Sequence, residues 1–100
     1  MKITRNAGQA SILLDERLDA HNAPHLKSIF LELSQVGIHQ LEVHASQVEF
    51  LDSAGLAAII SGLKLARSGR GELYIVNASP VVKQLLSLTL LDQVIPQREG

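Results

Sequence analysis

The sequence predicts a small single-domain α/β protein in which helices pack on a mixed, mainly parallel β-sheet. Segments with the period-two alternation of strands and segments with helical spacing follow one another in the order β-β-α-β-α-β-α, with a candidate last edge strand. Strands that alternate with helices favour a sheet covered by helices. The chain has 100 residues, of which 46% are hydrophobic, enough for one modest core. We therefore expect residues 1–100 to form one unit.

The composition excludes several classes of function. The net charge of −1 and the 3% of aromatic residues argue against nucleic acid as a direct partner. Cysteine is absent, which removes disulfides, thiolate metal sites and thiol catalysis and agrees with a reducing compartment. No apolar run follows Lys2 and Arg5, and no stretch approaches the roughly 20 apolar residues of a membrane span. We expect a cytoplasmic protein without membrane insertion.

The first third of the chain predicts a hairpin and a helix. Residues 2–14 are two extended runs around NAGQ, where Gly8 can adopt a positive φ. In residues 22–37, Asn22 can cap the helix, Pro24 falls in its first turn and Gly37 can end it. The apolar side of this helix consists of Leu26, Ile29, Phe30 and Leu33.

The middle of the chain returns to period two and then to helical spacing. In IHQLEVHAS, residues 38–46, Leu41, Val43 and Ala45 alternate with polar residues and predict a strand. A short extended piece follows at 48–51. The next helix has an apolar stripe, and the glycines at 69 and 71 end it. This stripe consists of Leu56, Ile59, Ile60, Leu63 and Ala66.

The last third predicts one more strand and helix. ELYIV, residues 72–76, has the composition of a strand. Ser79 is placed to cap the following helix, with Pro80 in the favoured first helical position. DQVIP, residues 92–96, is the candidate last edge strand, before a polar tail at 97–100.

Ser53 stands between an extended segment and an apolar helix, in the stretch VEFLDSAGLAAII. Three roles suit a serine there: a helix cap, a catalytic nucleophile, or a hydroxyl that another protein modifies. Its position favours the cap, because a serine side chain can accept a bond from a first-turn N–H. Ala54 and Gly55 leave the hydroxyl unshielded, and a strand end beside a helix N-terminus is a common ligand position in α/β sheets. These features strengthen the case for a functional role.

A phosphate on Ser53 would be compatible with the helix that follows. It would add a charge of about −1.5 to −2 at the positive end of the helix dipole, near free backbone N–H groups. The neighbouring Asp52 carboxylate would repel it, and an acidic or apolar partner docked there would lose affinity. The residues are thus consistent with a switch in which the fold survives and the interface fails.

A hydrolase is a second interpretation of the same serine. A serine on a strand-to-helix turn is similar to the nucleophile elbow G-x-S-x-G, but Leu51 stands in place of the first glycine. One hundred residues also leave little room for an enclosed pocket and an oxyanion hole. We expect no enzymatic activity. The histidines that could supply a base are His21, His25, His39 and His44.

The stretch DERLDAHNAP places polar residues before the first helix. His21 and His25 are four residues apart with Asp19 nearby, but His21 precedes the helix and no third neutral ligand is evident, so we expect no metal or other cofactor. The simpler interpretation is a loop in which Asp19 and Asn22 form a turn and a cap. Loops before two helices often share one end of an α/β sheet, so this segment can form a composite surface with Ser53.

Two stretches resemble the STAS domain family, the module of bacterial anti-sigma factor antagonists. VEFLDSAGLAAII looks like the phosphorylation-site motif of that family, and ERLDAHNAPHLK is similar to its segment between the second strand and the first helix. GRGELYIVNASPVVKQLL and the order of the elements match as well. The resemblance covers nearly the whole chain and implies a small α/β domain without catalysis of its own.

The resemblance also implies partners. In this family an unphosphorylated antagonist binds an anti-sigma factor that is a serine kinase of the histidine-kinase-like ATPase type, which frees a sigma factor. The kinase phosphorylates the motif serine, here Ser53, and a PP2C-type phosphatase reverses the modification. Asp19 and Asp52 would then lie at or beside the docking surface, with Gly55 allowing close approach. The residues we expect at the partner surface are Asp19, Asn22, Asp52, Ser53, Ala54 and Gly55.

The chain departs from the family pattern at two places. Many members have a second hydroxyl residue after the motif serine, whereas this chain has Ala54, which leaves Ser53 as the only acceptor in the motif. The family's glycine ahead of the first loop is Asp15 or absent. STAS domains also serve in lipid-transport and stress-signalling assemblies, so the alternative function is a non-switching scaffold subunit of an ATPase transporter or stress-signalling complex.

Overall fold

The computed structural model of the chain describes residues 1–100 and contains strands, three α-helices and one 3₁₀ helix. Their order confirms the predicted alternation of strands and helices. The strands are β1 (Lys2–Asn6), β2 (Gln9–Leu13), β3 (Arg17–Leu18), β4 (Gln40–His44), β5 (Phe50–Leu51), β6 (Glu72–Val76) and β7 (Gln97–Arg98). The helices are α1 (Ala23–Gln35), α2 (Ser53–Ser68), α3 (Pro80–Leu88) and the 3₁₀ helix η1 (Leu91–Gln93).

The main sheet is mixed and mainly parallel, as predicted. Its strand order is β1-β2-β4-β6-β7, and only β1 and β2 run antiparallel. The predicted hairpin is confirmed: its two-residue turn has φ of 33° at Ala7 and 84° at Gly8, because a tight hairpin turn that matches the strand twist needs positive φ at both central residues.

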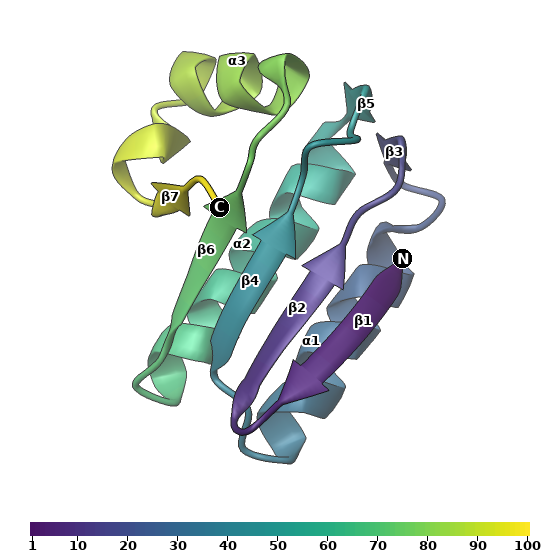
Figure 1. The fold of residues 1–100 in the computed structure, drawn as a ribbon. Helices are drawn as coiled ribbons and strands as arrows, with labels where there is room; N and C mark the ends of the chain where they lie inside the picture. Colours follow the sequence, from purple (N-terminus) through teal and green to yellow (C-terminus); the bar gives the residue numbers. More distant parts are fainter.

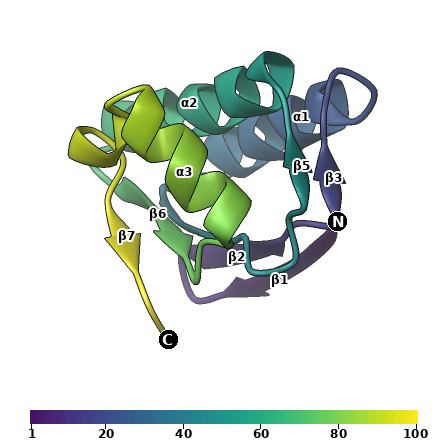
Figure 2. The ribbon, with the colours of Figure 1, turned by 90° about the horizontal axis from the view of Figure 1, so that it is seen from above.

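The molecule has two layers and an open face. Figure 1 shows α1 and α2 side by side behind the main sheet, and Figure 2 shows that no helix covers the opposite face. The helix α3 lies beyond the carboxyl end of β6, at the same end of the sheet as β3 and β5. None of the helices combines the length and the apolar character required to cross a membrane.

The core lies between the sheet and the α1–α2 pair. Buried strand residues alternate with polar ones as the period-two pattern predicts; in β4, Leu41 and Val43 are buried. In α2 the predicted stripe is buried except for Ile60, which is half-buried. Gly62 lets the two helices approach, since a Cβ there would lie 2.5 Å from the Phe30 ring.

The ends of the helices follow local signals. Gly37, with φ of 79°, comes two residues after the end of α1, and α2 ends at Ser68 with Gly69 as its C-cap. The predicted cap of α3 is confirmed, because the Ser79 hydroxyl accepts a bond from the Val82 N–H at 3.3 Å.

Of the three two-residue strands, β5 lies within the predicted extended piece 48–51, whereas the sequence places β7 wrongly and misses β3. The segment 92–96 is not a strand; η1 occupies part of it, and the last strand is β7, inside the expected polar tail. β7 is held by backbone pairing with β6, Ile75 opposite Gln97, and its exposed residues carry no alternating pattern. The strand β3, Arg17–Leu18, was not predicted because two residues are too few to show a period.

Candidate functional site

The small second sheet brings the two candidate segments together. β3 pairs in parallel with β5, with Arg17 opposite Phe50 and Leu18 opposite Leu51. Both strands therefore end at the same place, where one continues into the loop 19–22 and the other into Asp52 and α2. This confirms the expectation that the loop before α1 lies beside the start of α2.

The N-cap of α2 is Asp52, not Ser53. Asp52 has extended backbone angles, φ −104° and ψ −178°, and its Oδ1 accepts a bond from the Gly55 N–H at 2.8 Å. The prediction that Ser53 caps the helix is therefore wrong. Aspartate caps as well as serine does, and the chain enters the helix one residue earlier than the serine position suggested.

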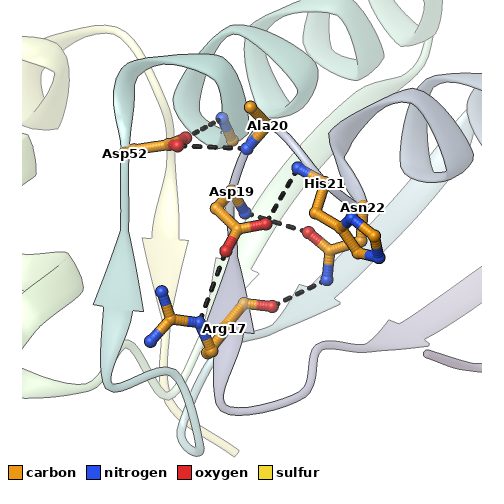
Figure 3. Close-up of polar contacts among 7 residues, drawn as sticks. Arg17, Asp19, Ala20, His21, Asn22 and Asp52 are labelled. Atoms are coloured by element: carbon orange, nitrogen blue, oxygen red, sulfur yellow. Dashed lines mark hydrogen bonds and ion pairs between the residues drawn. The ribbon is translucent and has the colours of Figure 1, made fainter.

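The same carboxylate also holds the neighbouring loop. Asp52 Oδ2 accepts a bond from the Ala20 N–H at 3.0 Å, and Figure 3 shows both dashed contacts converging on the Asp52 carboxylate. One side chain thus links the start of α2 to the β3–α1 loop, which are 32 residues apart in sequence.

Ser53 is the first residue of α2, and it is exposed. Because Asp52 supplies the cap, the Ser53 hydroxyl is not the acceptor for the first-turn N–H. Ala54 is half-buried and Gly55 is buried. The backbone that approaches Gly55 closely belongs to this chain: a Cβ at position 55 would lie 2.5 Å from the Leu18 carbonyl oxygen.

The loop 19–22 is ordered by its own side chains. The Asp19 N–H donates to Asn22 Oδ1 at 2.9 Å, the His21 N–H donates to Asp19 Oδ1 at 3.0 Å, and Asn22 Nδ2 donates to the Arg17 carbonyl at 2.8 Å. Asn22 occupies the N-cap position of α1 but makes no side-chain cap bond. The prediction of Asn22 as a side-chain cap is therefore wrong, because its amide folds back onto the loop (Figure 3).

Asp19 is the one ionisable group with a clear change in acidity. The His21 backbone N–H is the main cause that lowers the pKa of Asp19 below its ordinary value of 3.8. Desolvation opposes it, and the Arg17 guanidinium and the Asn22 backbone N–H lower the pKa further. Arg17 Nε lies 3.3 Å from Asp19 Oδ2, so the carboxylate is charged across the neutral pH range.

Arg17 and Phe50 were not singled out from the sequence. The Arg17 guanidinium lies over the Phe50 ring at 4.3 Å from its centroid, and Phe50 is 41% exposed. An exposed aromatic ring beside a cation is a common feature of protein interfaces. The only sequence signal was an aromatic residue two positions before Asp52, in a short extended segment.

The histidines do not form a cluster around Ser53, although His21 belongs to the neighbouring loop 19–22. His39 packs against Gly69 at the opposite end of α2, about 24 Å away for 16 residues at about 1.5 Å per residue. His44 lies at the end of β4, where its Nε2 is 3.4 Å from Glu42. His21 and His25 are exposed, and the structure contains no group of three His, Cys, Asp or Glu side chains that could hold a metal ion.

The fold and the site define a small α/β domain that presents an exposed serine at a helix N-terminus, beside an ordered loop that begins with Asp19. The model of the STAS domain family matches residues 2–99. The chain therefore belongs to the STAS domain family.

Relatives of this chain carry a common description. An anti-sigma-B factor antagonist of Staphylococcus epidermidis is 29% identical over 83 residues, which are 83% of this chain and 77% of the relative. A Thermotoga maritima structure, described as a candidate anti-sigma factor antagonist, has a TM-score of 0.91 and 26% identity and covers 99% of this chain and 86% of its own. The structure of the anti-sigma factor antagonist SpoIIAA in its unphosphorylated form has a TM-score of 0.80 and 16% identity. The match covers 99% of this chain and 86% of SpoIIAA, so the two proteins share the fold.

Proposed function

We propose that this chain is an anti-sigma factor antagonist whose unphosphorylated form binds an anti-sigma factor, and that phosphorylation of Ser53 ends the binding. The observation that carries the proposal is the position of Ser53, exposed at the first residue of α2, in a STAS domain. The relatives' names support the general role. SpoIIAA, which shares the fold, is an antagonist whose structure is that of its unphosphorylated form.

The geometry supports a phosphate acceptor at this serine. Ser53 is free of the capping role, so its modification breaks no bond that the α2 cap requires. A phosphate there lies at the positive end of the α2 dipole, which offsets part of its charge. The fold is therefore expected to remain intact when the serine is modified.

The same geometry explains how modification would block a partner. Asp19 and Asp52 already carry negative charge beside Ser53, and Asp19 is kept charged by its neighbours. A phosphate adds about 1.5 to 2 negative charges to this surface. A partner that fits the unmodified surface would then be repelled by the added negative charge and would have to bury the phosphate, which weakens binding.

The expected partners follow from the family. They are an anti-sigma factor that is a serine kinase of the histidine-kinase-like ATPase type, and a PP2C-type phosphatase, both acting in the cytoplasm. The kinase docks on Asp19, Asn22, Asp52, Ser53 and the first turn of α2, whose position depends on the close packing of buried Gly55 on Leu18.

Intact-mass measurement tests the proposal. The protein is incubated with ATP and a co-encoded ATPase-like kinase, and wild type is compared with Ser53→Ala. We expect a mass gain of one phosphate in wild type alone. No gain in wild type with any such kinase would overturn the switch and favour the non-switching scaffold role.

A further inference from the structure

The outer edge of β1 is the longest uncovered strand edge in the molecule. β1 lies at one end of the main sheet and pairs only with β2, and all five of its residues are exposed. The opposite end of the sheet is β7, which has two residues. Because unpaired backbone groups along an edge bind other strands, the edge of β1 specifies a strand as its occupant.

The register identifies the backbone groups that are free. Asn6 and Gln9 flank the two-residue turn and so exchange hydrogen bonds. Hydrogen-bonded pairs alternate along an antiparallel ladder, so Lys2 and Thr4 also direct their backbone groups toward β2. The N–H and C=O groups of Ile3 and Arg5 therefore point away from the sheet.

A groove runs beside this edge on the helix side. It has a volume of about 300 Å³ and is lined by both Ile3 and Arg5. Ile3 is 42% exposed and Val36 is 59% exposed. Glu32 is the acidic group in the groove and Arg5 the basic one, so the groove offers apolar contact together with both signs of charge.

We propose that the edge of β1 pairs with the same edge of a second copy of this chain, antiparallel, with the twofold axis at Thr4. In this register Ile3 lies opposite Arg5 of the second copy, and each such pair exchanges both of its N–H···O bonds. Thr4 faces Thr4 of the second copy, and Lys2 faces Asn6. No like charges lie opposite each other, which makes the strand self-complementary.

The neighbouring registers are less suitable. Pairing centred on Arg5 would place two guanidinium groups directly opposite each other, which is destabilising. Pairing centred on Ile3 would need the backbone of Met1, whose amino group is bonded to Asp15 at 2.8 Å. The Thr4 register uses only free groups, and it involves no residue of the Ser53 site.

A single cysteine tests this register. The chain has no cysteine, so Thr4→Cys introduces only one thiol. Directly opposed residues in a non-hydrogen-bonded pair have Cβ atoms about 4.5–5.5 Å apart, near disulfide reach. We expect mild oxidation to give covalent dimers of Thr4→Cys, at least several-fold faster than of Ser87→Cys, a matched exposed control on α3.

A second variant blocks the edge without removing a bond of the β1–β2 ladder. Arg5→Pro deletes an outward N–H, and Arg5→Lys keeps both the N–H and the charge. In the Thr4→Cys background we expect Arg5→Pro to abolish cross-linking while the circular dichroism spectrum is kept, and Arg5→Lys to retain it. The proposal is overturned if Thr4→Cys cross-links no faster than Ser87→Cys and light scattering gives a monomer mass at every concentration. The same result overturns it if the edge of β1 binds another protein instead of a second copy.

Discussion

Asp52 Oδ2 accepts a hydrogen bond from the Ala20 N–H at 3.0 Å, and Oδ1 of the same carboxylate caps α2 through the Gly55 N–H at 2.8 Å. One side chain therefore sets both the start of α2 and the position of the loop before α1. The surface around Ser53 is held by the residue before the serine, so the exposed serine has no part in capping the helix.

Replacing Asp52 is expected to weaken the fold. Asp52→Ala removes a cap worth about 0.5–2 kcal/mol and a loop bond worth about 1 kcal/mol, so we expect a loss of roughly 1.5–3 kcal/mol in the free energy of unfolding. Asp52→Asn keeps one acceptor oxygen and should lose less. Urea denaturation measures both, and Asp92→Ala, on exposed η1, is the control. Equal stability of Asp52→Ala and that control would contradict the bridging role.

Ser53 is expected to affect binding rather than stability. Ser53→Ala should change the free energy of unfolding by no more than about 0.5 kcal/mol, because the cap is Asp52. Ser53→Asp should weaken binding to the anti-sigma factor by about 10- to 100-fold, or about 1.4–2.8 kcal/mol, with a nearly unchanged melting temperature. Isothermal titration calorimetry with Ser87→Asp as control checks this. Undiminished binding of Ser53→Asp would show that charge at this position does not control the partner.

Gly55→Ala is expected to destabilise the protein although alanine favours helices. The added Cβ would lie 2.5 Å from the Leu18 carbonyl oxygen and 2.8 Å from Leu51 Cδ1, so β3 or α2 must shift. Such overpacking costs about 1–3 kcal/mol, more than the roughly 1 kcal/mol gained in helix propensity. Thermal unfolding beside Ser68→Ala, at the exposed end of α2, measures the difference. A more stable Gly55→Ala would mean that β3 and α2 are not in tight contact.

Asp19 is expected to make stability depend on pH in the acid range. Its folded pKa is lowered chiefly by the His21 N–H and then by Arg17, so the stabilising contribution is present above the unfolded value near 3.8 and is lost as pH falls through the lower folded value. Asp19→Asn should remove that part of the pH dependence. Urea midpoints between neutral pH and the acid limit of folding test this, and identical slopes for both proteins would contradict it.

The sequence predicted the regular elements because their side chains report their environment. The alternation of Leu41 and Val43 with polar residues marked β4, and the stripe from Leu56 to Ala66 marked α2. The cap at Ser79 was predicted because it depends on a bond three residues along the chain. Short-range spacing was sufficient for these features.

The candidate site was predicted in part. The exposed serine at the start of α2 and the neighbouring loop with Asp19 were visible as a motif and a polar turn. The cap and the inter-loop bond were not, because Asp52 and Ser53 are both good capping residues and the sequence does not show which of them keeps extended backbone angles, as Asp52 does. Asn22 illustrates the same limit, since its side chain bonds the Arg17 carbonyl instead of α1.

What the sequence determined by itself was the order of the elements, the turn at Gly8, the helix ends at Gly37 and Gly69, and the exposed serine beside a carboxylate. What only the tertiary structure decided was the pairing of β3 with β5, the last strand at Gln97–Arg98, and the choice of Asp52 as cap and bridge. The physical reason is that a helix or long strand is specified by the spacing of its own side chains. A two-residue strand or a bond between residues 32 positions apart depends on backbone groups that meet only when the chain has folded.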